Sequence, residues 1–177
     1  SMDNSPYAAI AQNMQRYRNP DTIGFMQSAY FGLINEIDAH VGKILDTLDT
    51  LGLTDNTLVV FTSDHGEMLG AHGMREKNVF YEESAHIPLI MRLPGEIPAS
   101  ITRTNPVTQV HLFNTILDYL QQPDTTAEGQ SLRSLINDEN ADGFNTAVCE
   151  WGNRKVPNFM ITDGTWKLMI AREPDAP

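Results

Sequence analysis

The residues most able to do chemistry follow an uninterrupted apolar segment. After Leu58–Phe61 the chain continues through Thr62 to Asp64 and His65, which stand side by side before Gly66. A carboxylate oxygen beside an imidazole nitrogen suits a divalent metal cation whose other ligands come from elsewhere. Gly66 allows the backbone to turn sharply, so that both side chains can face one cation. The pair also fits a structural role, in which Asp64 caps a turn and His65 bonds to the main chain. The local pattern leaves both interpretations open.

A glycine-rich loop downstream adds a second imidazole, His72, and a lysine, Lys77. A lysine ammonium is a compact charge that suits an anionic substrate oxygen, although a loop lysine also fits a solvated surface. The glycines lack the spacing of a nucleotide-binding fingerprint, and no Gly-Lys-Ser/Thr sequence occurs. Cys149 is the only cysteine, and we expect it in a strand as a buried, inert thiol rather than a nucleophile.

Composition and charge exclude several classes of protein. The 177 residues are 41% hydrophobic, which is typical of a globular chain and excludes disordered and collagen-like proteins. Against 12 basic residues there are 23 acidic ones, and the net charge of −11 repels nucleic acid and anionic membrane surfaces. The apolar runs are far shorter than the roughly 20 residues of a membrane helix, so we expect no membrane span. The start of the chain has no leader pattern, and localisation is left open.

A long amphipathic helix is predicted over Thr22–Leu51, capped by Asp21 or Thr22 and followed by Gly52. Its apolar residues recur at steps of three and four, which places them on one helix face. They are Met26, Tyr30, Leu33, Ile34, Ile37, Val41, Ile44, Leu45, Leu48 and Leu51. We expect this face to pack against a sheet.

The segment Thr57–Thr62 is continuously apolar or β-branched, which predicts a strand buried on both faces, as in a parallel sheet. A second strand is expected over His86–Leu93. A helix that leads into a buried strand indicates the α/β class, with a predominantly parallel sheet flanked by helices. In such sheets ligands gather beyond the carboxyl ends of the strands, where Asp64 and His65 stand.

The second half of the chain predicts smaller elements. A helix follows Pro106 and stops before Pro123, and a short helix is expected over Ser131–Asn137. Thr146–Trp151 is predicted as a strand, and Asp163-Gly164 between two apolar runs predicts a hairpin. We therefore expect a lead-in over residues 1–20, an α/β part over 21–125 and a small antiparallel part over 126–177.

An ordered set of segments carries a family resemblance over most of the chain from about residue 25. The set comprises Ile37–Leu45, Asp55–Thr57, Val59–Glu67, Leu69–Gly73, Lys77, Phe80–Ser84, Ile87–Ile90 and Pro94-Gly95, with Val107–Leu120, Gly129–Leu135 and Trp166–Leu168 as later pieces. Together they resemble the C-terminal half of the sulfatase family, within the alkaline-phosphatase-like superfamily. The resemblance implies an alkaline-phosphatase-like fold and hydrolysis of the sulfate ester of a small molecule or glycan.

The resemblance also implies roles for single residues. Asp64 and His65 match metal ligands, in sites that usually hold calcium and in some relatives another divalent ion. Lys77 matches the lysine that grips the sulfate and supports the leaving oxygen. His72 either lines the pocket as a catalytic group or orders its loop.

One departure from the family concerns the nucleophile. Family enzymes attack with a formylglycine made from the first residue of a Cys/Ser-x-Pro-x-Arg motif, and no such motif occurs in these 177 residues. The resemblance places it in an N-terminal half, so we expect a partial site, no turnover by this chain alone, and self-association through uncovered apolar surface. Two alternatives stay open: a phosphonate or phosphate ester hydrolase of the same superfamily, and a non-catalytic binding module.

Overall fold

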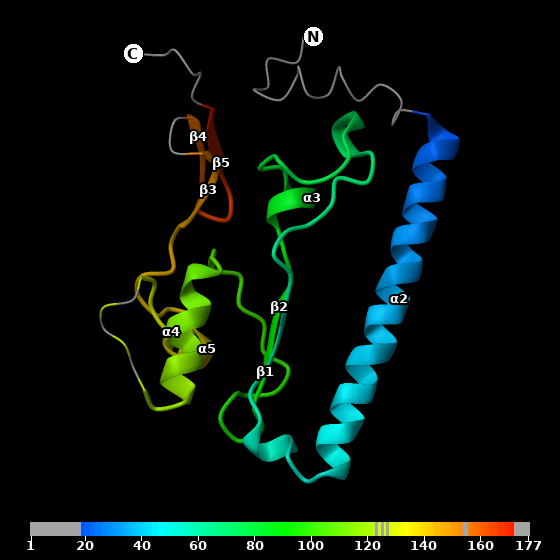
Figure 1. Ribbon diagram of the computed structural model, residues 1–177. Coiled ribbons are helices and arrows are strands. Elements are labelled where there is room, and N and C mark those ends of the chain that lie inside the picture. The colour runs from blue at the N-terminus through cyan, green and yellow to red at the C-terminus, as the bar shows by residue number, and fades with distance from the viewer. Residues whose placement is uncertain (1–18, 123, 125, 127, 154–155, 172–177) are drawn as a thin grey trace. The chain divides into compact units, whose positions relative to one another are not determined.

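The computed structural model describes residues 19–122, 124, 126, 128–153 and 156–171 (Figure 1). Residues 1–18, which make up most of the lead-in predicted over residues 1–20, lie outside the described residues. The chain divides between Met91 and Arg92 into two compact units, which are described separately.

The first unit begins with the long helix α2, Pro20–Thr50. The predicted helix is confirmed, but its N-cap is Asn19, whose side chain accepts a hydrogen bond from the Asp21 amide at 2.9 Å. Pro20 follows directly because a proline at the first helical position gives up only an N–H that the helix leaves unpaired there. After the helix Gly52 adopts a positive φ of 64°, which glycine tolerates.

Strands β1, Val59–Thr62, and β2, Leu89–Arg92, form a two-stranded sheet. Oγ1 of Thr62 donates to the carbonyl of Pro88 at 2.8 Å, so the end of β1 lies beside the start of β2. The strands therefore run in opposite directions, as Figure 1 shows. The parallel partners expected for this strand are not among the described residues, and Phe61 is 37% exposed, so within this chain β1 is not a central, doubly buried strand.

The loop between β1 and β2 supplies the core of the first unit. It contains the short helix α3, Glu82–Ala85, and a 3₁₀ turn at Ala71–Gly73. Four apolar side chains of this loop are buried, namely Met68, Met74, Val79 and Phe80. The polar side chain of Ser84 is buried with them. The segment that follows Asp64 and His65 is thus packed around its own core.

The second unit contains helices α4, Val110–Tyr119, and α5, Arg133–Asn137, which confirm the two predicted helices. Strands β3, Ala147–Asn153, β4, Val156–Thr162, and β5, Lys167–Ala171, form an antiparallel sheet in the order β3-β4-β5. The predicted hairpin is confirmed at Asp163-Gly164 between β4 and β5. Oδ1 of Asp163 accepts the amides of Thr165 at 2.8 Å and Trp166 at 2.6 Å, which fixes the turn.

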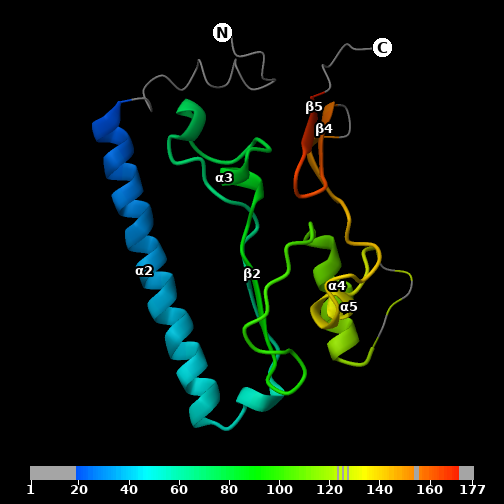
Figure 2. The same ribbon diagram turned by 180° about the vertical axis from the view of Figure 1, so that it is seen from behind.

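The apolar face of α2 is the main difference from the expected packing. The helix contains no buried residue, and Phe25 is 77% exposed. Both ribbon views show α2 beside the loop after β1 near the start of the helix, where Nε2 of Gln27 donates to the Leu69 carbonyl at 3.3 Å (Figures 1 and 2). Beyond these turns its apolar residues, such as Ile37 at 53%, stay exposed. Within the described residues, no helix combines the length and apolar character required to cross a bilayer.

Candidate functional site

Asp64 and His65 lie together immediately after β1, as the sequence predicts. Oδ2 of Asp64 is 3.3 Å from Nε2 of His65. Oδ1 of Asp64 accepts the main-chain amide of His65 at 3.0 Å, and Oγ of Ser63 donates to the His65 carbonyl at 2.7 Å. These bonds turn the chain so that two neighbouring side chains approach each other.

The tautomer of His65 follows from its other nitrogen. Nδ1 lies 2.7 Å from the carbonyl oxygen of Gly66, and because a carbonyl only accepts, Nδ1 carries the proton. In the neutral ring Nε2 is then an acceptor that faces a second acceptor, Oδ2 of Asp64. Two acceptors 3.3 Å apart repel each other unless a proton or a metal cation lies between them.

This geometry fits two ligands of one divalent cation. Two ligand atoms about 2.3 Å from a cation, at a right angle to each other, lie about 3.3 Å apart. The carboxylate of Asp64 is 83% exposed and therefore accessible to an ion. Among the residues that the structure describes, no group of three or more His, Cys, Asp and Glu side chains forms a metal site. The described part of the chain thus offers a pair of ligands rather than a complete set.

Lys77 acts electrostatically on the same site. Partial desolvation raises the pKa of the Asp64 carboxyl. A protonated His65, two main-chain N–H groups and the charge of Lys77 outweigh this effect and lower that pKa overall. The charge of Lys77, which stands twelve positions after His65 in the sequence, makes the smallest of these contributions. A metal-binding pair and an ammonium together can hold an oxyanion.

His72 lies on another side of the loop. Its ring stacks on Tyr81 with centroids 3.9 Å apart and an interplanar angle of 10°. Its Nε2 is 4.0 Å from Oε2 of Glu83, and its backbone has a positive φ of 54°. Among the described residues these contacts join His72 to Tyr81, directly before α3, and to Glu83 within α3 rather than to Asp64 or His65. They favour the loop-ordering role over the catalytic one.

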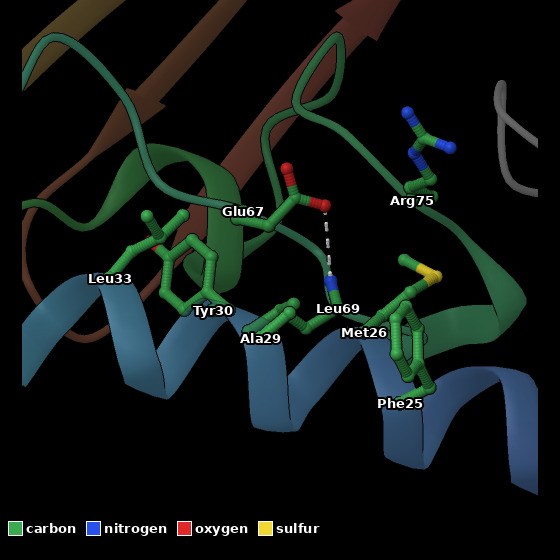
Figure 3. A pocket seen from close by; sticks show the side chains of 8 residues that line it. All are labelled: Phe25, Met26, Ala29, Tyr30, Leu33, Glu67, Leu69 and Arg75. Carbon is green, nitrogen blue, oxygen red and sulfur yellow. Dashed lines mark hydrogen bonds between the residues drawn. The ribbon is translucent and has the colours of Figure 1, made fainter.

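A hollow of about 240 Å³ separates the first turns of α2 from the loop after β1 (Figure 3). Phe25, Met26, Ala29, Tyr30 and Leu33 line it from the helix, and Glu67, Leu69 and Arg75 line it from the loop. Oε1 of Glu67 accepts the amides of Leu69 at 3.4 Å and Glu76 at 2.6 Å. This carboxylate therefore orders the loop, and we assign it no chemical role.

A sequence model of the sulfatase family matches residues 6–122, well over half of the chain. The chain belongs to the sulfatase family. The N-acetylglucosamine-6-O-sulfatase of Bacteroides thetaiotaomicron is 33% identical to it over 144 residues, which cover 75% of this chain and 25% of the relative. The resemblance found in the sequence is therefore confirmed.

Two solved structures show that this sulfatase chain has an alkaline-phosphatase-like α/β fold, which confirms the predicted class. One, determined in complex with its substrate D-glucosamine-2-N,6-O-disulfate, gives a TM-score of 0.71 at 30% identity over 77% of this chain and 29% of the other. The phosphonate monoester hydrolase of Silicibacter pomeroyi gives 0.78 at 29% identity over 85% and 33%. The chain thus spans about a quarter to a third of the length of these proteins.

Sequence reasoning about this sulfatase chain named Gly66 for its freedom to turn but missed the contacts through which Gly66 and Ser84 hold the site together. A Cβ atom on Gly66 would lie 2.0 Å from the main-chain oxygen of Glu83, so the backbone passes Glu83 where only glycine fits. The amide of Gly66 donates to the carbonyl of Ser84 at 2.8 Å, and Oγ of Ser84 donates to the carbonyl of Lys77 at 2.9 Å. The available signal was a glycine directly after the Asp-His pair.

Cys149 of the sulfatase chain lies in β3, as predicted, but its side chain is exposed rather than buried. Desolvation by its neighbours still raises the pKa of the thiol. A raised pKa disfavours the thiolate, so Cys149 remains unsuited to act as a nucleophile.

Proposed function

We propose that this sulfatase hydrolyses sulfate esters, as a sulfuric ester hydrolase, and that Asp64, His65 and Lys77 belong to its active site. The observation that carries the proposal is the pair of facing acceptors after β1, 3.3 Å apart. Lys77 makes the smallest of the contributions that lower the pKa of Asp64. Such an arrangement combines cation ligands with a group that attracts an anion.

We assign Asp64 and His65 as ligands of a divalent cation, calcium in our proposal. When bound, the cation supplies Lewis-acid polarisation of the sulfate oxygens. The Gly66 carbonyl contributes by holding the proton of His65 on Nδ1, which keeps Nε2 available as a ligand. Ligation of the cation by Asp64 and by His65 depends on the turn after β1, which brings the two side chains together.

Lys77 binds the sulfate group and offsets the negative charge that grows on the leaving oxygen during bond cleavage. Removal of a preorganised group that stabilises transition-state charge typically lowers turnover by about 10²–10³-fold. His72 has the positioning role: its stacking on Tyr81 orders the loop between the metal ligands and α3.

The nucleophile in this proposal is a formylglycine from a Cys/Ser-x-Pro-x-Arg motif, which these 177 residues do not contain. We place it outside this sequence, together with the remaining cation ligands. Turnover then requires those parts, because the groups of a coupled site act only in concert with the attacking group.

A sulfated small molecule or glycan is the substrate class that we propose. Two similar proteins support it: the N-acetylglucosamine-6-O-sulfatase relative, and the solved structure bound to D-glucosamine-2-N,6-O-disulfate. The phosphonate monoester hydrolase supports the alternative activity on phosphonate or phosphate esters, since these share the tetrahedral shape of sulfate.

The test is turnover of p-nitrophenyl sulfate, N-acetylglucosamine-6-sulfate and phenyl phosphonate by the complete gene product with calcium. We expect sulfate esters to be preferred and Lys77→Ala to lower kcat/KM by about 10²–10³-fold. Lys43→Ala is the matched control because Lys43 is an exposed lysine of α2. Preference for the phosphonate would establish the alternative activity. Binding of the esters without turnover would establish a binding module.

A further inference from the structure

We propose that Ser84 is a positioning residue that fixes Lys77 relative to Asp64 and His65. The inference rests on the proposed function, because it concerns how the predicted sulfate-binding lysine is held in place relative to the predicted metal ligands.

Ser84 joins the two parts of the site through two different groups. Its main-chain carbonyl accepts the amide of Gly66, the residue directly after His65, at 2.8 Å. Its side-chain hydroxyl donates to the carbonyl of Lys77 at 2.9 Å. One residue therefore ties the backbone of the predicted metal ligands to the backbone of the predicted sulfate-binding lysine.

The surroundings of Ser84 make this link rigid. The residue is only 5% exposed, so water has little access to its hydroxyl. Its amide donates to the Tyr81 carbonyl at 3.0 Å within the turn that begins α3. On the other side, the Glu83 carbonyl lies so close to Gly66 that no side chain fits between them. A hydrogen bond in such a place has few alternative geometries.

The carbonyl of Lys77 has a second donor, the amide of Val79. Two donors at one carbonyl oxygen fix the peptide plane that follows Lys77 and limit where its side chain can start. Without the Ser84 hydroxyl, the Val79 amide still holds the carbonyl, so Ser84→Ala should loosen this segment without unfolding the loop.

The positioning role predicts that Ser84→Ala changes the affinity of the site for sulfate but not its affinity for calcium. Ser84→Ala keeps the main-chain bond from Gly66, so calcium binding by Asp64 and His65 should not change. The Lys77 side chain becomes less well placed, and inorganic sulfate should bind about three- to tenfold more weakly, the range that corresponds to one hydrogen bond. A merely structural role would weaken both ligands together.

The experiment uses the 177-residue chain labelled with ¹⁵N. Relaxation of the Lys77 and Asn78 amides reports their mobility, and titrations with calcium and then with inorganic sulfate report affinity. Ser28→Ala is the matched control, because the Ser28 hydroxyl also donates to a carbonyl, that of Gly24 at 2.8 Å, but at an exposed position on α2. Ser84→Thr keeps a hydroxyl and should restore the behaviour of the unmodified chain.

The two proposals fail in different ways. If the complete gene product binds neither calcium nor sulfate, the assignment of the site is wrong, and the amide relaxation of the 177-residue chain alone decides the role of Ser84. Increased mobility confined to Lys77 and Asn78 in Ser84→Ala supports it. Unchanged mobility, or an equal loss of calcium and sulfate binding, overturns the positioning role even where the site itself is confirmed.

Discussion

Replacement of Gly66 by alanine tests how closely the backbone beside Asp64 and His65 passes the main chain of Glu83. An added Cβ would lie 2.0 Å from the Glu83 oxygen and 3.0 Å from its carbonyl carbon. Both atoms belong to the main chain, so no flexible side chain can move aside. The backbone of Gly66 is not in the left-handed region, and the expected cost is therefore steric.

The magnitude follows from three contributions. Overpacking a tight site costs about 1–3 kcal/mol, and disturbing the bond from the Gly66 amide to Ser84 costs about 0.5–1.5 kcal/mol. The lower entropy of an unfolded chain with alanine offsets about 0.4–1 kcal/mol. The net loss of unfolding free energy is roughly 1–4 kcal/mol, and each kcal/mol lowers Tm by about 2–4 °C in a chain of this size.

The assay is thermal unfolding followed by circular dichroism, with hydrogen exchange of the amides between residues 66 and 84. Gly42→Ala is the matched control because a Cβ at this position in α2 would meet no atom within 4 Å. Alanine is a better helix former than glycine by about 1 kcal/mol, so this variant should melt about 2–4 °C higher. A Gly66→Ala protein as stable as the unmodified chain, with unchanged exchange, would refute the steric reasoning.

Four further predictions concern single features of the chain. The chain alone should bind calcium only weakly, with a Kd of about 10⁻³ M or higher, and Asp64→Ala should remove that binding in titration calorimetry; tight binding that survives would exclude the assignment. It should also not hydrolyse aryl sulfates, and metal-dependent turnover that Lys77→Ala abolishes would mean that the attacking group is misassigned. Asp163→Ala should lower Tm, whereas Asp163→Asn keeps the acceptor and most of the stability. The turn amides lower the pKa of Asp163, so its contribution is present above its ordinary pKa and declines as pH falls through the lower folded value; a constant difference in Tm between pH 7 and pH 2 would contradict this. The exposed face of α2 should cause self-association, and Ile37→Glu should reduce the mass measured by analytical ultracentrifugation.

Local chemistry explains why most elements were predictable. The period of apolar residues defined α2, and the Asp163-Gly164 pair defined the β4–β5 hairpin, because both signals depend on residues close in sequence. Asp64 and His65 were recognised as a possible metal pair because adjacent residues at a strand end need only a turn to converge.

The partners of these elements were less predictable. Apolar periodicity identifies the face of α2 that can pack but not the surface that covers it, and in this chain that face stays exposed. The run of apolar residues in β1 likewise suggested parallel neighbours, whereas the bond between Thr62 and Pro88 shows an antiparallel partner.

The sequence by itself determined the family, the long helix, the hairpin and the types of groups available for chemistry, since motifs and periodicity are properties of neighbouring residues. Only the tertiary structure decided which proton His65 keeps, that His72 stacks on Tyr81, and that Ser84 links Gly66 to Lys77. These contacts join residues up to 18 positions apart through a folded loop. Their geometry depends on how the chain returns on itself, which no local pattern specifies.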